Sequence, residues 1–309
     1  MPAAPSDSWA RPVTAGVVSG LVGFTSAFVI VLGGLSSVGA TAAQSASGLL
    51  AVSVLMGLSS ILLSLGTRMP ITVAWSTPGA ALPATTGPVE GGWAAAVGAF
   101  CVTGLLIVLT GYVPVLGDLI ARIPPSVAQA MLAGVLFQLC LGPVTGLAKN
   151  PVAVAPVVVT WLLAARFAPR WATPAAFVVA AAVIALDVAR SGAHPATADL
   201  LPRLELTVPS LTAGAVAGIA LPLYLVTMAS QNVPGVAVMK SFGYEVPWRR
   251  SILVTGVGTV VGAPAGGHAI NLAAISAALA AGPDAGPDRS RRWIASVTGG
   301  SVVIVLGMG

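Results

Sequence analysis

Charged side chains are too scarce along this chain to form the surface of a water-soluble protein. Lys and Arg number 14 and Asp and Glu 9 in 309 residues, so 7% of the chain is charged, against roughly 25% in an average soluble domain. Hydrophobic residues make up 56%, and lipid must therefore cover most of the folded surface. This composition excludes a soluble globular protein and predicts an all-α polytopic membrane protein.

Apolar stretches bounded by charges, prolines or glycine clusters follow one another along the whole sequence. A membrane-spanning helix needs about 20 residues, so the stretches predict about eleven crossings. The expected ranges are 12–36, 44–66, 70–88, 92–112, 123–147, 151–168, 171–189, 209–232, 248–263, 264–281 and 293–309.

The basic residues predict how these crossings are oriented. With a cytoplasmic N-terminus, eleven of the 14 Lys and Arg residues fall on the cytoplasmic side, and only Lys149, Arg190 and Arg203 fall outside. This is a strong positive-inside bias. It also requires 70–88 and 264–281 to be full crossings, since omitting either would reverse every later loop.

Several other classes of function lack support in the sequence. The basic residues are spread between apolar runs and form no patch that could follow a phosphate backbone, so nucleic acid is not an expected partner despite the net charge of +5. Cys101 and Cys140 have neither disulfide nor zinc spacing. The predicted crossings contain no Ser/His/Asp triad, paired carboxylates or metal-ligand cluster. We expect no enzymatic activity, no metal and no cofactor.

Two of the crossings are unusual for helices. Pro70 and Pro78 flank a β-branched run, which disfavours one continuous helix. An extended piece followed by a half-helix fits better, with Thr77 as N-cap and Pro78 at the first helical position. Residues 264–272 (PAGGHAINL) repeat this pattern, with Asn271 as the second cap. Extended backbone at membrane depth requires protein or a cavity around it, so the two breaks predict one buried site between them.

Three pairs of segments indicate an internal repeat. Seven predicted crossings separate the starts of the two units, and an odd number inverts the second unit in the membrane. Inverted repeats with paired broken helices are typical of secondary transporters. We expect the second unit to stop after four crossings, so that counterparts of roughly 110–190 are missing. The aligned pieces are 14–21 with 212–219 at an offset of 198, Pro70 and Thr77 with Pro264 and Asn271 at 194, and Trp93 with Trp293 at 200.

Three motifs carry a family resemblance. The segments AWSTPGAA at 74–81, MASQNVPG at 228–235 and GGHAINLAAI at 266–275 resemble the bacterial benzoate/proton symporter (BenE) family. That family is similar to the uracil/xanthine permeases and sulfate-type anion transporters, which have a seven-plus-seven inverted repeat. The resemblance implies a multi-pass protein of the bacterial inner membrane that imports benzoate with a proton. A homodimer is one oligomeric state that the sequence leaves open.

The resemblance also implies a division into domains. Residues 12–112 would form the core domain of the first repeat, 113–190 its gate domain, and 205–309 the core domain of the second repeat, truncated before its C-terminal gate helices. Acidic residues contact substrate in the nucleobase permeases, whereas Ser230, Gln231, Asn232 and His268 occupy those places here.

The expected substrate site combines the two breaks with the 230–232 segment. Its residues are Trp75, Ser76, Thr77, Pro78, Gly79, Ser230, Gln231, Asn232, Gly267, His268, Ala269, Ile270 and Asn271. Half-helix N-termini would receive the carboxylate and Trp75 the ring. His268 would carry the coupling proton.

Each role has a structural alternative. His268 could be a neutral imidazole bonded to a backbone carbonyl, Trp75 could simply pack, and Thr77 and Asn271 could be caps alone. Gln231 and Asn232 could mark the interfacial end of their helix. At the level of function, the alternatives are a nucleobase or inorganic-anion carrier of the same fold, a passive anion channel and a non-transporting fragment.

Overall fold

The computed structural model describes residues 9–122, 141–191 and 201–309, together with positions 126, 130, 133 and 137. Most of them are helical. The elements are α1 (Ala10–Thr25), α2 (Phe28–Ser37), α3 (Ala42–Thr67), β1 (Val73–Trp75), α4 (Thr77–Thr86), α5 (Gly92–Tyr112), α6 (Pro114–Ala121), α8 (Gly142–Lys149), α9 (Pro151–Phe167), η1 (Pro169–Trp171), α10 (Ala172–Ser191), α11 (Ala213–Ala215), η3 (Val216–Ala220), α12 (Leu221–Thr227), η4 (Met228–Asn232), α13 (Val233–Ser241), α14 (Trp248–Gly262), η5 (Ala263–Ala265), β2 (Ile270–Leu272), α15 (Ile275–Ala281), η6 (Pro283–Ala285), η7 (Arg289–Arg291) and α16 (Trp293–Gly307).

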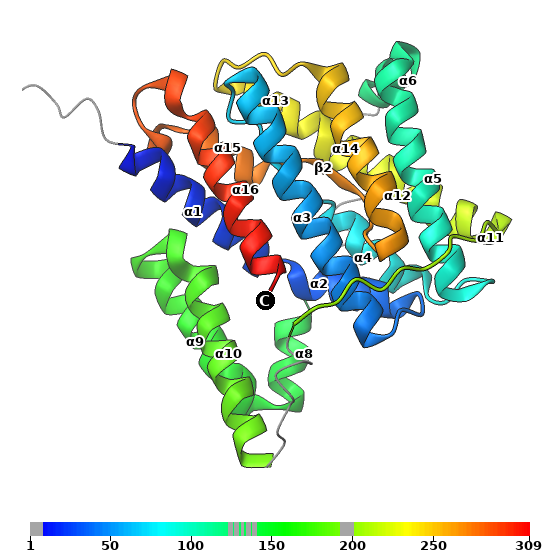
Figure 1. Cartoon of the computed structure of the whole chain (residues 1–309). Coiled ribbons are helices and arrows are strands. Elements are labelled where there is room, and N and C mark those ends of the chain that lie inside the picture. The colour runs from blue at the N-terminus through cyan, green and yellow to red at the C-terminus, as the bar shows by residue number, and fades with distance from the viewer. Residues whose placement is uncertain are drawn as a thin grey trace, which may run out of the picture.

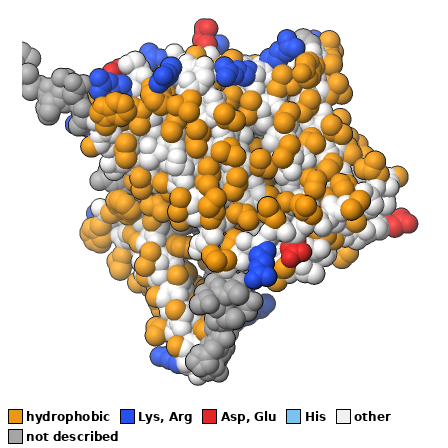
Figure 2. All heavy atoms as spheres, in the orientation of Figure 1, with side chains coloured by type: hydrophobic (Ala, Val, Ile, Leu, Met, Phe, Trp, Pro, Cys, Tyr) orange, Lys and Arg blue, Asp and Glu red, His pale blue; other side chains and the backbone are white. Residues whose placement is uncertain are grey.

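Within the described ranges, five helical segments are long and apolar enough to cross a membrane: Ala10–Ser37, Ala42–Thr67, Gly92–Tyr112, Ala172–Arg190 and Ala213–Ser241. Apolar side chains cover the middle of the molecule, and Lys and Arg gather along one edge of it (Figure 2). A polytopic membrane protein is therefore confirmed, while the count of eleven crossings stays a prediction. Most of the expected 123–147 crossing lies outside the described residues.

Two expected helix boundaries are corrected. The crossing at 12–36 is interrupted, because α1 ends at Thr25 and α2 begins at Phe28. The crossing expected to end at 232 continues to Ser241 through two π-helical turns, η3 and η4. Polar residues near 232 suggested an interface, but Asn232 is fully buried.

The two unusual crossings have the strand-plus-helix form that the prolines predict. β1 is followed by α4, and β2 is followed by α15. The strands pair antiparallel, with Val73 opposite Leu272, Ala74 opposite Asn271 and Trp75 opposite Ile270. Figure 1 shows β2 inside the helical body. The sheet therefore joins two segments that lie almost 200 residues apart in the sequence.

Side chains satisfy the free edge of β1. Ser60 Oγ of α3 accepts a hydrogen bond from the Val73 N–H at 2.8 Å, and Met56 Sδ accepts one from the Trp75 N–H at 3.1 Å. Unpaired backbone groups are costly where water is absent. These contacts explain how extended backbone persists in the interior.

The edge of β2 is satisfied in the same way. Thr259 Oγ1 of α14 accepts from the Ile270 N–H at 3.1 Å, and Asn232 Oδ1 accepts from the Leu272 N–H at 2.8 Å. Each strand is thus held by its partner strand on one side and by helix side chains on the other.

Small residues allow close packing around the sheet. α3 packs on α16 where Gly57 meets Gly300, and α14 packs on α5 where Gly256 lies against Val108 and Gly104 against Val260. A Cβ atom at any of these glycines would overlap its neighbour. Close backbone contact of this kind is typical of membrane helices.

α8, α9 and α10 lie to one side of the body that the other helices form (Figure 1). α10 packs on α9 and reaches the body through α1. Many apolar side chains of α9 and α10 are exposed, among them Val152 and Val178. These helices present an apolar surface suited to lipid.

Candidate functional site

The fold brings together the three segments predicted to form the site. Strand pairing places 73–75 against 270–272, and the bond from the Leu272 N–H to Asn232 fixes the π-helical turn η4 beside them. Trp75, Ser76, His268 and Asn271 are all buried. The predicted juxtaposition is therefore present, whereas the individual roles need correction.

The cap of α4 is Ser76 and not Thr77. Ser76 Oγ accepts a hydrogen bond from the Gly79 N–H at 3.2 Å, and Thr227 Oγ1 donates to Ser76 Oγ at 2.9 Å. Thr77 is the first helical residue and Pro78 the second. Ser76 occupies the cap position because its backbone is extended and Thr227 hydrogen-bonds its side chain. The local sequence pattern does not indicate this contact between distant segments.

Asn271 does not cap α15. It lies in β2 opposite Ala74, and α15 begins at Ile275 after Ala274, without a side-chain cap. The Asn271 Nδ2 donates to the Leu272 carbonyl at 2.8 Å, while its buried Oδ1 has no hydrogen-bond partner in the described chain. α4 and α15 begin 198 positions apart, so the expected offset of 194 at the break is wrong and the offset of 198 seen at the first aligned pieces holds here too.

His268 is 1% exposed. Its ring lies against the backbone of Ser76, yet neither ring nitrogen has a hydrogen bond within the described ranges. The alternative in which the imidazole supports the break through a backbone carbonyl therefore remains, because the ring contacts the Ser76 backbone. Gly267 and Ala269 flank His268, and the Ala269 carbonyl accepts from the Ser76 N–H at 2.9 Å.

The 230–232 segment is buried in the middle of a helix and is not an interfacial end. Asn232 is fully buried, Ser230 is 7% exposed, and Gln231 is half-buried. Asn232 also donates from Nδ2 to Met228 Sδ at 3.2 Å. Because Asn232 bonds both η4 and β2, it supports the fold of the site, and π-helical turns are frequent at such sites.

Trp75 packs within a row of aromatic rings. Its ring centroid lies 5.5 Å from that of Phe24, which stacks on Phe28 at 5.7 Å, and Phe28 meets Phe177 of α10 edge-on at 5.4 Å. Trp75 therefore packs against another ring, as its structural alternative expects. The row of rings extends to α10. Sequence reasoning missed these phenylalanines, although Phe24 and Phe28 are four residues apart in the first apolar stretch.

The hydroxyl groups that support the strands and the cap were not predicted from the sequence either. Ser60 and Thr259 each bond a strand N–H, from 13 and 11 residues before it, and Thr227 bonds the cap Ser76. Ser and Thr are common in membrane helices, so only the spacing before each proline break could have indicated them.

Metal ligands do not gather in the part of the chain that the structure describes: no group of three or more His, Cys, Asp or Glu is close enough to bind a metal ion there.

The bundle of apolar helices around the paired broken crossings defines a polytopic membrane protein. The chain belongs to the BenE family, described as benzoate membrane transport protein, whose pattern matches residues 6–309. It is therefore a membrane transport protein of that family.

Two relatives are similar over most of the chain. Inner membrane protein YdcO of Escherichia coli (strain K12) is 36% identical over 297 residues, covering 95% of this chain and 74% of that protein. The benzoate membrane transport protein of Acinetobacter baylyi (strain ATCC 33305 / BD413 / ADP1) is 28% identical over 302 residues, covering 97% and 76%.

Proposed function

We propose that this chain is a secondary transporter that carries benzoate, or a similar aromatic carboxylate, inward with a proton by alternating access. The observation that carries the proposal is the set of buried polar atoms without partners at the paired strands, namely both ring nitrogens of His268 and Oδ1 of Asn271. Buried polar groups are normally hydrogen-bonded. Unpartnered ones beside two strand breaks are therefore suited to a ligand.

The carboxylate binds at the start of α4. A helix N-terminus carries partial positive charge and attracts anions, and His268 lies against the backbone of its cap, Ser76. Ser76, Thr77, Pro78 and Gly79 would contact the substrate from one segment, and 267–271 from the segment hydrogen-bonded to it. Ser230 and Gln231 line the η4 side. In the described chain no Asp or Glu is buried there to recognise a nucleobase N–H, which favours an anion.

Proton coupling follows from the cost of buried charge. An isolated carboxylate or imidazolium is expensive in the membrane interior. Together they form a neutral pair, because His268 donates from its protonated ring to the substrate carboxylate. Each ligand then strengthens the binding of the other, which is the thermodynamic condition for coupling. One proton per benzoate is the expected stoichiometry.

The proposed scaffold is an inverted repeat. Ser60 and Thr259, which bond equivalent strand N–H groups, are 199 positions apart, and so are Gly57 and Gly256 at the packing contacts of α3 and α14. α3 packs on α16 while α14 packs on α5, an exchange of partners expected from a pseudo-two-fold axis in the membrane plane. These matching offsets support two related units.

The domains follow from this scaffold. Residues 12–112 and 205–309 form the core, which the paired strands hold together, and 113–190 form the gate. α9 and α10 lie beside the core and contact it through α1, so they can move relative to the site. Alternating access then consists of core movement against the gate.

The proposed orientation places the N-terminus in the cytoplasm. Arg68 at the end of α3 lies over the ring of Trp293 at 4.5 Å, and Arg250 donates to the Gly66 carbonyl. The end of α3 and the starts of α14 and α16 therefore lie at one basic edge, together with Arg68 and Arg250. The positive-inside rule assigns this edge to the cytoplasm.

Counterflow tests the proposed carrier activity. Proteoliposomes loaded with unlabelled benzoate and diluted into labelled benzoate should accumulate label transiently, after subtraction of protein-free liposomes because benzoic acid crosses bilayers unaided. Unlabelled benzoate outside should compete, whereas benzamide, uracil and sulfate should not. Equal competition by uracil or sulfate would reassign the substrate. Leakage of benzoate without counterflow would favour a passive channel, and no protein-dependent flux would favour a non-transporting fragment.

A further inference from the structure

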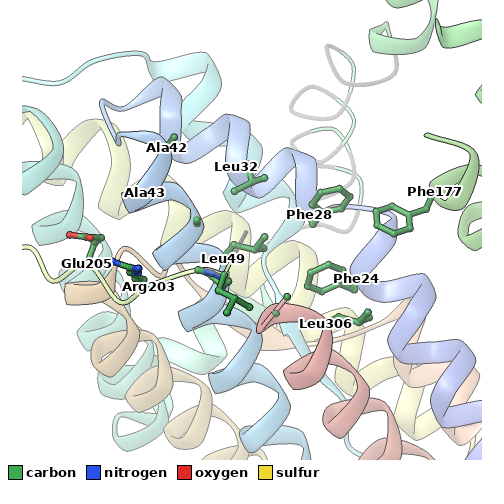
Figure 3. Close-up of a pocket in the computed structure, with 15 residues that line it drawn as sticks. Phe24, Phe28, Leu32, Ala42, Ala43, Leu49, Phe177, Arg203, Glu205 and Leu306 are labelled. Carbon is green, nitrogen blue, oxygen red and sulfur yellow. The ribbon is translucent and has the colours of Figure 1, made fainter. Parts of the chain in front are cut away.

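A cavity of about 740 Å³ lies between α1, α2, α3, α10, the end of α16 and the segment at 201–205 (Figure 3). Its volume falls in the range of roughly 300–1,000 Å³ typical of small-molecule sites. None of the residues predicted to bind substrate lines it. The cavity is therefore distinct from the predicted substrate residues, and Leu306, Gly307 and Gly309, in the last part of the sequence, form part of its wall.

The two ends of the cavity differ in chemistry. Figure 3 shows Arg203 and Glu205 at one end and Phe24, Phe28 and Phe177 at the other. Arg203 and Glu205 are exposed, whereas Phe24 is 6% exposed. The charged end is thus the mouth, and Phe24 is the buried residue of the aromatic end, where Phe28 and Phe177 are half-buried.

The aromatic end adjoins the proposed substrate site. Phe24 lines the cavity and packs against the buried Trp75, with 5.5 Å between ring centroids. Phe24 therefore connects the wall of the cavity to Trp75, the residue before the cap of α4. Phe177 comes from α10, so the ring contacts of this end involve both sides of the proposed core and gate.

The mouth of the cavity lies near the start of α3, and the basic edge lies at the other end of this helix. The Glu205 N–H donates to Ser47 Oγ near the start of α3 at 2.9 Å, while Arg68 follows the last residue of this 26-residue helix. In the proposed orientation the mouth therefore opens to the outside.

We infer that this cavity is an outer vestibule for an aromatic monocarboxylate, an inference that rests on the proposed function. Arg203 attracts the carboxylate at the mouth, because a cation there raises the local concentration of an anionic substrate. Phe28 and Phe177 then receive the aromatic ring, and Phe24 connects the wall of the vestibule to Trp75. Glu205 opposes the attraction and weakens it.

The charge arm of the test uses three variants in proteoliposomes. Arg203→Gln should raise the KM for benzoate uptake by about threefold at low salt, the scale of an exposed charge interaction, and Glu205→Gln should lower it. Arg190→Gln, an exposed arginine outside the cavity, is the matched control and should leave the KM unchanged. The differences should shrink at about 1 M salt, where the screening length is about 3 Å, and Arg203→Lys should restore the wild-type KM.

The ring arm compares two phenylalanines. Phe177→Leu should raise the KM for benzoate by about threefold and reduce the preference for benzoate over cyclohexanecarboxylate, because aromatic pairs gain energy beyond buried area. Phe167→Leu, at a residue that is 78% exposed and outside the cavity, should change neither.

The outcomes separate this inference from the proposed function. If wild-type protein transports no benzoate, the proposed function fails. If wild-type protein transports benzoate but Arg203→Gln, Glu205→Gln and Arg190→Gln all have the same KM, the vestibule is overturned and the proposed function stands. The same conclusion follows if Phe177→Leu has the same KM and the same substrate preference as Phe167→Leu. A lower KM in Arg203→Gln with a higher one in Glu205→Gln would also overturn it, because the mouth would then attract cations.

Discussion

At the scale of single residues, the site divides into groups that hold the backbone and groups that remain available. Ser60, Asn232 and Thr259 use their polar atoms on strand N–H groups. The His268 ring nitrogens and the Asn271 Oδ1 have no such use within the described chain. Substitutions in the first group should therefore act on stability, and those in the second group on transport.

His268→Ala should lower the rate of proton-driven benzoate uptake by about tenfold or more, while equilibrium binding at alkaline pH, where the wild-type imidazole is neutral, should change by less than about threefold, about 0.65 kcal/mol. The reason is that the imidazole supplies the proton, whereas the helix end and the contacting segments supply most of the affinity. Uptake and binding are measured on the same preparation. Equal losses in both, together with a lower melting temperature in detergent, would assign His268 a structural role instead.

Thr259→Val should reduce the free energy of unfolding by about 1–3 kcal/mol, the cost of leaving a buried N–H unpaired, here that of Ile270. Thr145→Val serves as the control, since Thr145 is exposed in α8 and bonds only carbonyls of its own turn. Denaturant titration in detergent measures both. A loss no larger than that of Thr145→Val would show that Ile270 finds another partner.

At the scale of elements, close packing positions α4. Gly34 of α2 lies directly against the Ala80 carbonyl of α4, with no room for a Cβ atom, whereas its neighbour Gly33 has nothing within 4 Å of the position a Cβ would take. These adjacent glycines therefore allow a matched comparison. α2 sets where α4 begins, and with it the place of Ser76.

Gly34→Ala should displace α4 and weaken benzoate binding by about tenfold or abolish it. Gly33→Ala should keep binding and gain up to about 1 kcal/mol in stability, since Ala has the higher helix propensity. Equilibrium binding and thermal unfolding of the two variants decide between these outcomes. Similar binding by both would mean that α4 does not need this contact.

The sequence predicted the kind of each element better than its residue-level chemistry. Pro70, Pro78 and Pro264 break helices through local sterics, so the strand-plus-helix crossings were predictable. The cap at Ser76 depends on Thr227, and the place of Asn271 depends on pairing with Ala74. Such contacts between distant segments leave no local signal. The aromatic row from Trp75 to Phe177 was not predicted, for the same reason.

At the scale of the whole molecule, one edge is basic and the opposite edge holds the 201–211 segment. Single cysteines at these edges test the proposed orientation. In a Cys101→Ala, Cys140→Ala background, Arg203→Cys in intact cells should react with a membrane-impermeant maleimide, and Lys240→Cys should react only after the membrane is opened. Both positions are exposed. The reverse pattern would place the N-terminus outside.

The central claim is that the protein couples benzoate uptake to a proton gradient, and the initial rate of uptake into proteoliposomes measures it directly. With an acidic exterior, labelled benzoate should enter faster than in protein-free liposomes, because a carrier of one proton per benzoate reaches the same final level as passive benzoic acid but reaches it sooner. This excess rate should be lost when a protonophore collapses the gradient and should be strongly reduced in His268→Ala. An initial rate equal to that of protein-free liposomes, or a protein-dependent excess that survives the protonophore, would contradict the account.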